Sequence, residues 1–194
     1  MVELCFATNN VHKIEEIRAL LGSFFLLKTL QDIGCNEELA ETQNTIEGNS
    51  LQKARYVFDR YQVPCFADDT GLEVEALGGE PGVYSARYAG EQKNSEDNIR
   101  LLLKKLEGVP NRKARFRTVI TLAEADGIST FEGIVKGTIR LEKSGTYGFG
   151  YDPVFQPEGF NKTFGEMNLT EKSMISHRAI AVKKLVDFLK KKYA

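Results

Sequence analysis

The chain has 194 residues and a formal net charge of −1, and 42% of its residues are hydrophobic and 27% charged. A chain of this length and composition buries a full core and forms one compact domain, or one domain with two lobes. The near-zero charge provides no overall basic field for a nucleic-acid backbone, so we expect no nucleic-acid partner.

The sequence pattern also argues against secretion and membrane insertion. The N-terminal residues lack the basic segment and long apolar core of a signal peptide, and no run approaches the roughly 20 apolar residues of a membrane span. Cys5, Cys35 and Cys65 lie far apart, without metal-ligand pairing or a disulfide framework. An odd number of isolated cysteines fits the reducing cytoplasm. Because no run is long enough to span a membrane, we also expect no membrane partner.

The hydrophobic pattern of the N-terminal third predicts two strands and two helices. Gly22 marks the end of the first helix, because glycine is common just past a helix C-terminus. In chain order we expect a strand over residues 2–7, a helix over 11–21, a strand over 24–30, an acidic loop over 32–44 and a helix over 45–61.

The rest of the chain predicts an α/β fold with an antiparallel insertion. An apolar run over residues 63–67 opens a third strand, which we expect to end at Asp68 and Asp69 before a turn at Thr70 and Gly71. Further predicted elements are glycine-rich loops over 78–90 and 144–155, a helix over 94–106, a hairpin of strands over 114–125 and 128–141, and a final helix over 175–192. This order favours a mixed β-sheet.

The loop between the first strand and the first helix has the features of an anion site. Backbone N–H groups at a helix N-terminus attract negative charge. Thr8 and Asn10 would add side-chain donors, and Lys13 would reach back from one turn into the helix. The alternative is that Thr8 or Asn10 only caps the helix.

Asp68 and Asp69 are the strongest chemical signal, because neighbouring like charges disfavour each other's ionised form. A positive partner should offset that cost. Carboxylates at the end of a strand suit Mg²⁺, which binds through one or two carboxylates and substrate phosphates. One aspartate could hold the metal while the other takes a proton from water. The alternative is a turn in which Asp69 bonds the backbone near Gly71.

Two segments in the C-terminal half combine aromatic and charged residues. In residues 149–152, Phe149 or Tyr151 could stack on a base, and Asp152 could accept hydrogen bonds from a base or sugar. His177 and Arg178 stand at a predicted helix start, where cations are disfavoured, which indicates an anionic or electron-rich partner. The alternatives are a glycine turn with core aromatics and a solvated helix start.

Five segments in one order resemble a known family, the Ham1-like inosine/xanthosine triphosphate pyrophosphatases. They are TNNVHK (residues 8–13) with Glu16, ADDTGL (67–72), LGGEPGVYSARY (77–88), FGYDP (149–153) and SHR (176–178). Each segment alone is weak, but the ordered set is specific, and the resemblance extends over residues 4–185.

The resemblance implies an enzyme that hydrolyses ITP, dITP and XTP to the monophosphate and pyrophosphate, with Mg²⁺, and so removes deaminated purines from the nucleotide pool. It implies an elongated α/β fold, with a long mixed sheet flanked by helices and two lobes with a substrate cleft between them, all within a single domain over residues 1–194. It also implies a cytoplasmic homodimer.

The resemblance assigns roles to individual residues. Asp69 is the expected general base, with Asp68 beside it as the other candidate, and Glu41 and Asp69 are the expected metal ligands. Lys53 and Glu41 are uninformative without the resemblance. The expected substrate-binding residues are Thr8, Asn9, Asn10, Val11, His12, Lys13, Lys53, Thr70, Phe149, Gly150, Tyr151, Asp152, Lys172, His177 and Arg178. Of these, His177 and Arg178 would meet the purine edge.

Two residues depart from the family pattern. Asn9 and Tyr147 stand where many members have glycine. Asn9 affects how closely the backbone of residues 8–13, the predicted phosphate loop, can approach a phosphate, and Tyr147 affects the shape of the rim of the base pocket. The alternatives to this function are a Maf-like pyrophosphatase acting on other nucleotides and a nucleotide-binding sensor without turnover.

Overall fold

The computed structural model describes residues 2–193, which form an α/β fold around one mixed sheet. The strand order is β2-β1-β3-β5-β6-β7, with β4 paired to β3. β1 runs parallel to β2 and β3, whereas β3–β4 and β6–β7 are antiparallel. These features confirm the predicted α/β class and mixed sheet.

Most helices and strands lie where the sequence predicted them. The helices are α1 (Val11–Leu21), α2 (Ile46–Tyr61), α3 (Ser95–Lys105), α4 (Leu169–Ile175) and α5 (His177–Tyr193). The strands are β1 (Val2–Phe6), β2 (Phe25–Lys28), β3 (Cys65–Val74), β4 (Pro81–Gly82), β5 (Lys113–Glu124), β6 (Gly127–Ile139) and β7 (Phe155–Pro157).

The chain divides into two compact units, and the division falls within β3, β5 and β6. The first unit comprises residues 2–69, 118–133 and 178–193, and the second comprises residues 70–117 and 134–177.

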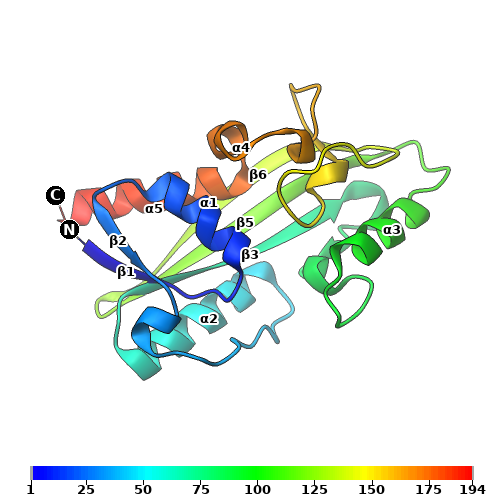
Figure 1. The fold of residues 1–194 in the computed structure, drawn as a ribbon. Coiled ribbons are helices and arrows are strands. Elements are labelled where there is room, and N and C mark those ends of the chain that lie inside the picture. The colour runs from blue at the N-terminus through cyan, green and yellow to red at the C-terminus, as the bar shows by residue number, and fades with distance from the viewer. Residues whose placement is uncertain (1, 194) are drawn as a thin grey trace. The chain divides into compact units, whose positions relative to one another are not determined.

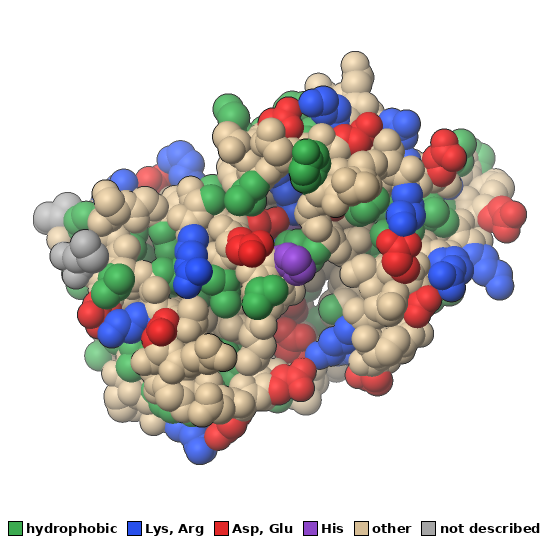
Figure 2. Space-filling model, viewed as in Figure 1, with side chains coloured by type: hydrophobic (Ala, Val, Ile, Leu, Met, Phe, Trp, Pro, Cys, Tyr) green, Lys and Arg blue, Asp and Glu red, His purple; other side chains and the backbone are tan. Residues whose placement is uncertain are grey.

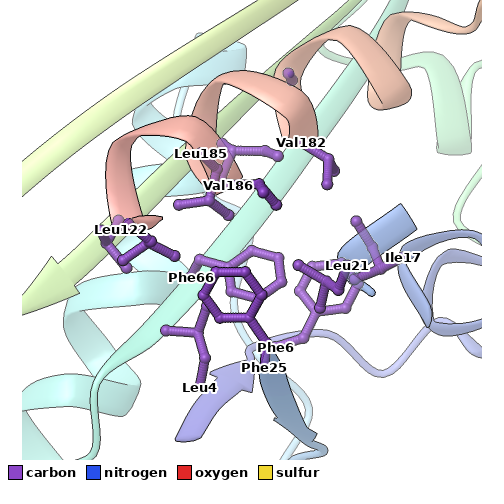
Figure 3. Packing of buried hydrophobic residues seen from close by; sticks show 13 residues of the cluster. Leu4, Phe6, Ile17, Leu21, Phe25, Phe66, Leu122, Val182, Leu185 and Val186 are labelled. Carbon is purple, nitrogen blue, oxygen red and sulfur yellow. The ribbon is translucent and has the colours of Figure 1, made fainter. Parts of the chain in front are cut away.

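The sheet of the first unit is covered by helices on both faces. α1 and α5 lie over one face and α2 lies over the other (Figure 1). Phe6 and Phe66 point to the α1–α5 face and stack with their ring centroids 4.6 Å apart. Figure 3 shows Val182, Leu185 and Val186 of α5 packed over them. On the α2 face, Cys5, Cys65 and Ala67 pack with Ala54 and Val57.

The second unit has its own hydrophobic core. Leu72 and Val74 of β3 pack in one cluster with Ile99 and Leu102 of α3. Phe116 of β5 packs in the same cluster, with its ring 4.7 Å from that of Phe155.

One sequence prediction about element boundaries is wrong, and one helix was missed. The expected turn at Thr70 and Gly71 does not form, because β3 continues from Cys65 to Val74. Both aspartates of this strand have buried partners, so their polarity does not mark an exposed turn. The predicted final helix over residues 175–192 is confirmed as α5, but the sequence analysis missed α4, and Ser176 takes an extended conformation between the two helices. Asn168 and Glu171 form a capping box that starts α4, a signal that is present in the sequence.

Among residues 2–193, no helix is both long enough and apolar enough to cross a membrane. On the face drawn in Figure 2, acidic and basic side chains of the described residues are interspersed rather than gathered into one large patch of a single sign.

Candidate active site

Asp68 and Asp69 are neighbours on β3, but their side chains lie on opposite faces of the sheet. Successive side chains of a strand alternate between faces. Asp68 shares the α1–α5 face with Phe66, and Asp69 shares the α2 face with Ala67. The strand therefore gives the two carboxylates different surroundings, which explains how both fit into one short segment.

Asp68 is completely buried and is held by two cations. Its Oδ1 accepts a hydrogen bond from Lys13 Nζ at 2.9 Å, and its Oδ2 accepts one from Arg178 Nε at 3.0 Å. Burial alone would raise the pKa of Asp68, but Lys13, Arg178 and Lys53 outweigh burial and hold that pKa well below its usual value. Asp68 is thus a fixed anion with a cation on each oxygen.

Arg178 joins Asp68 to a second acid, Glu16 of α1. Its Nη1 donates to Glu16, and its side chain is 2% exposed at the start of α5. Two carboxylates therefore stabilise a cation at a helix N-terminus, where the helix dipole disfavours it. These contacts favour a structural role for Arg178, and its predicted contact with the purine edge stays a prediction.

Asp69 lies beside α2, in a less cationic environment. Its Oδ2 accepts a hydrogen bond from Asn49 Nδ2 at 3.2 Å. Burial raises the pKa of Asp69, and the nearby carboxylate of Glu41 raises it further. The alternative of an aspartate turn is wrong, because Asp69 lies within β3 and bonds a side chain of α2.

Lys53 lies among the acidic groups of this cluster. Its Nζ donates to Glu41 Oε1 at 2.6 Å and to the backbone oxygen of Asp68 at 2.7 Å. Burial lowers the pKa of the Lys53 ammonium. The nearby carboxylates of Asp69, Glu41 and Asp68 raise that pKa by more, so the ammonium stays charged. Lys53 also fixes the backbone of β3 at Asp68, next to the point where the side chains of Asp68 and Asp69 turn to opposite faces of the sheet.

The donor set fits a Mg²⁺ ion that shares its coordination with a substrate. Among the described residues, no group of three or more His, Cys, Asp and Glu side chains is arranged to hold a metal. Glu41 and Asp69 are close enough for the Glu41 carboxylate to raise the pKa of Asp69. Two carboxylates alone suit Mg²⁺, which takes its other oxygens from water and phosphates.

The predicted phosphate loop contains a helix cap. Asn10 Oδ1 accepts the N–H groups of His12 and Lys13, and Thr8 Oγ1 accepts the N–H of Asn10. The capping alternative is therefore confirmed for Asn10, and phosphate binding by Thr8 and Asn10 stays a prediction. The side chains of Val11 and His12 are exposed at the helix start.

Asn9 has a local role that a glycine at this position could not fill. Its Nδ2 donates to the backbone oxygen of Glu37, and its Oδ1 accepts the N–H of Leu39, both at 3.4 Å. Asn9 thus links the predicted phosphate loop to the acidic loop.

In the second unit, Asp152 organises residues 149–152. Its Oδ2 accepts hydrogen bonds from the Phe149 N–H at 2.8 Å and from Lys172 Nζ at 2.6 Å. A Cβ on Gly148, which has φ +73°, would lie 2.0 Å from the same oxygen. The Lys172 ammonium also lies 5.0 Å from the centre of the Phe149 ring. Phe149, Asp152 and Lys172 are therefore brought together, and Gly150 turns the chain with φ +61°.

Tyr151 and His177 are buried in the second unit. Tyr151 Oη donates to the backbone oxygen of Ser85 at 2.8 Å, and the His177 ring stacks on Phe116 at 4.5 Å. These contacts match the core alternative for Tyr151, and the substrate contacts of both residues stay predictions. Thr70 is half-buried on β3, and the side chain of Tyr147 is exposed.

An open groove of about 780 Å³ in the second unit contains none of the predicted site residues. Its charged lining mixes both signs, and Arg115 and Glu73 pair within it. The charged residues are Glu73, Glu75, Lys113, Arg115, Lys136 and Glu158.

Sequence reasoning named Glu16 only as part of a motif and missed Asn49. Asn49 lies one helical turn before Lys53 on α2, so helical spacing places both on one face. This spacing of Asn49 and Lys53 is the sequence signal that could have identified Asn49 as a site residue. Nothing in the sequence showed that the face meets Asp69.

Comparison with known proteins identifies relatives over nearly the whole chain. A model of the Ham1 family matches residues 4–188. A dITP/XTP pyrophosphatase of Flavobacterium johnsoniae is 55% identical over 97% of this chain and 98% of its own, and one of Bacillus subtilis is 44% identical over 97% and 98%. The solved structure of the Staphylococcus aureus Ham1 protein is similar, with a TM-score of 0.89 and 38% identity over 98% of this chain and 99% of its own.

Proposed function

The chain belongs to the Ham1 family, and we propose that it hydrolyses the non-canonical purine nucleotides ITP, dITP and XTP to the nucleoside monophosphate and pyrophosphate. The observation that carries the proposal is the cluster of the buried Asp69 and Lys53 with the half-buried Glu41, held on β3, α2 and the acidic loop. Relatives over the full chain are named dITP/XTP pyrophosphatases. The proposed enzyme is a hydrolase acting on acid anhydrides.

Glu41 and Asp69 would hold Mg²⁺ in this proposal. The ion would neutralise phosphate charge and stabilise the leaving pyrophosphate. Lys13 and Lys53 supply further positive charge in the first unit. The wild-type protein should release no pyrophosphate when Mg²⁺ is chelated.

Asp69 is the better general base of the two aspartates. Both oxygens of Asp68 already accept hydrogen bonds from cations, whereas Asp69 Oδ2 accepts one from a neutral amide. In the proposed reaction, Asp69 takes a proton from a water molecule that attacks the α-phosphorus in line. The bond between the α-phosphorus and the oxygen that bridges it to the β-phosphorus breaks. Pyrophosphate leaves with the electron pair of that bond, so no covalent nucleophile is required.

The second unit would bind the base. Hypoxanthine and xanthine present an acceptor at C6 where adenine presents a donor, so a site built from donors leaves unpaired groups against adenine. Phe149, fixed by the bond from its N–H to Asp152, would stack on the purine. Lys172 would support this arrangement through Asp152.

Phe149→Ala is expected to raise the KM for ITP about 5- to 150-fold, because stacking one base on an aromatic ring contributes about 1–3 kcal/mol. Inhibition by tripolyphosphate, which has no base, should be unchanged. Phe160→Ala, which removes a more exposed ring of the same unit, serves as the control. An unchanged KM in Phe149→Ala would remove stacking from the account.

A nucleotide panel tests the proposed function. Pyrophosphate release from ITP, dITP, XTP, GTP, ATP, UTP and CTP should be fast for the first three nucleotides and slow for the other four. Preference for pyrimidine nucleotides would support the Maf-like alternative. Tight nucleotide binding without pyrophosphate release would support the sensor alternative.

We further propose a homodimer in the cytoplasm. Cys5, Cys35 and Cys65 are all free and buried, which fits a reducing compartment. The net charge of −1 and the interspersed charges on the face drawn in Figure 2 support the expectation that the partner is a nucleotide rather than a nucleic acid.

A further inference from the structure

The acidic loop that carries Glu41 is tied to α2 by three side chains of that helix. Each side chain bonds a different one of the three successive loop residues Glu41, Thr42 and Gln43, so this part of the loop is held along the helix. Lys53 Nζ donates to Glu41 at 2.6 Å, Gln52 accepts the Thr42 N–H at 3.0 Å and donates to Thr42 Oγ1 at 2.9 Å, and Asn49 Oδ1 accepts the Gln43 N–H at 2.9 Å.

Of these three side chains, that of Asn49 also bonds the side chain of Asp69. Its Nδ2 donates to Asp69 Oδ2 at 3.2 Å while its Oδ1 accepts the Gln43 N–H. The side chain is 1% exposed. A buried amide is costly unless both its donor and its acceptor are paired, so these two bonds fix its orientation.

We propose that Asn49 is a positioning residue, which sets Asp69 and the Glu41 loop at the separation that a divalent cation requires. This inference rests on the proposed function, which makes Glu41 and Asp69 the metal ligands, and on the observed bonds of Asn49 to Asp69 and to the Glu41 loop. Asn49 does not itself act on the substrate.

The chemistry of the amide suits this role. Asn49 is neutral, so it orients Asp69 without neutralising the charge that attracts a cation. A lysine in the same place would compete with the metal. The N–H of Gln43 can only donate, so Asn49 must turn its oxygen toward the loop and its NH₂ toward Asp69.

The test uses Asn49→Ala in the full-length protein, with Mn²⁺ as the probe in calorimetric titration and ITP turnover as the second readout. Outer residues that orient metal ligands typically contribute 10- to 100-fold to affinity or activity. We expect Mn²⁺ affinity and kcat each to fall about 10- to 100-fold. The KM measured at saturating Mg²⁺ should change little, because Asn49 does not contact the nucleotide. Asn49→Asp, of similar size, should weaken kcat as strongly, because it replaces the donor with a second acceptor.

Two controls separate positioning from loss of stability. Asn98 is also a buried helix asparagine, which accepts the Ala89 N–H and donates to the Ala86 oxygen. Asn98→Ala should lower the melting temperature comparably and leave Mn²⁺ affinity unchanged. Gln52→Ala loosens the same loop without removing a bond to Asp69, and it should keep near-wild-type Mn²⁺ affinity.

The outcomes separate the inference from the proposed function. Wild-type Mn²⁺ affinity and kcat in Asn49→Ala would overturn the inference, as would equal losses in Gln52→Ala and Asn49→Ala. A wild-type protein that binds Mn²⁺ but releases no pyrophosphate would overturn the proposed function, and the Mn²⁺ titrations would still decide the role of Asn49. A wild-type protein that binds no Mn²⁺ would overturn the inference.

Discussion

Asp69→Asn is expected to lower kcat for ITP about 10³-fold, within the range that general acid–base catalysis contributes. The amide keeps the shape of the side chain but cannot accept a proton from water and is a poorer ligand for Mg²⁺. Pyrophosphate release at saturating ITP and Mg²⁺ measures the effect.

The fold should survive Asp69→Asn. Burial raises the pKa of Asp69, so the folded protein holds a proton there more tightly than the unfolded chain does. By linkage, the ionised carboxylate weakens folding once the pH exceeds the unfolded-state pKa, and the neutral amide removes that penalty. Urea unfolding at pH 7 should show a stability equal to or above that of the wild type. A variant with wild-type turnover would show that Asp69 is not the base.

Asp68→Asn is expected to lower the free energy of unfolding by about 3–5 kcal/mol, the usual effect of breaking a buried ion pair. The change leaves Arg178 and Lys13 with one fewer carboxylate in a buried cluster. Urea unfolding at pH 7 measures it. Lys183→Ala, which removes an exposed pair with Asp187, is the matched control and should change stability little.

The same variant should change how stability depends on pH. Because Lys13, Arg178 and Lys53 outweigh burial and lower the pKa of Asp68, its contribution is fully present above the ordinary carboxyl pKa of about 4 and is lost as the pH falls through the lower folded-state value. The stability gap between wild type and Asp68→Asn should therefore narrow below about pH 4. A gap that stays constant down to pH 2 would contradict the ion-pair account.

Local signals in the sequence were enough to predict most of the fold. The apolar face of residues 11–21 and the glycine after it predicted α1 with its observed bounds, and the helix predicted over residues 94–106 is α3 with Asn94 as its N-cap. The two long strands β5 and β6 lie where the hairpin was predicted, joined at residues 125 and 126. These features depend on residues close together in the chain.

Contacts between distant residues explain what the sequence did not reveal. Asp68 and Arg178 are 110 positions apart, and no local pattern shows that they meet. The aspartate pair therefore suggested a turn, although alternation along β3 separates the two side chains. The same limit applies to Asn49, whose bond to Asp69 crosses 20 positions. The sequence indicated two neighbouring carboxylates with a positive partner. In the structure, Asp68 is a fixed anion between two cations and Asp69 is the candidate base.

Hydrolysis of ITP in ¹⁸O-labelled water tests the central claim most directly, namely that a water molecule positioned by Asp69 attacks the α-phosphorus. Mass spectrometry of the products should find the label in inosine monophosphate and none in pyrophosphate, with the reaction about 10³-fold slower in Asp69→Asn. Label in the pyrophosphate, or release of orthophosphate in its place, would contradict the account.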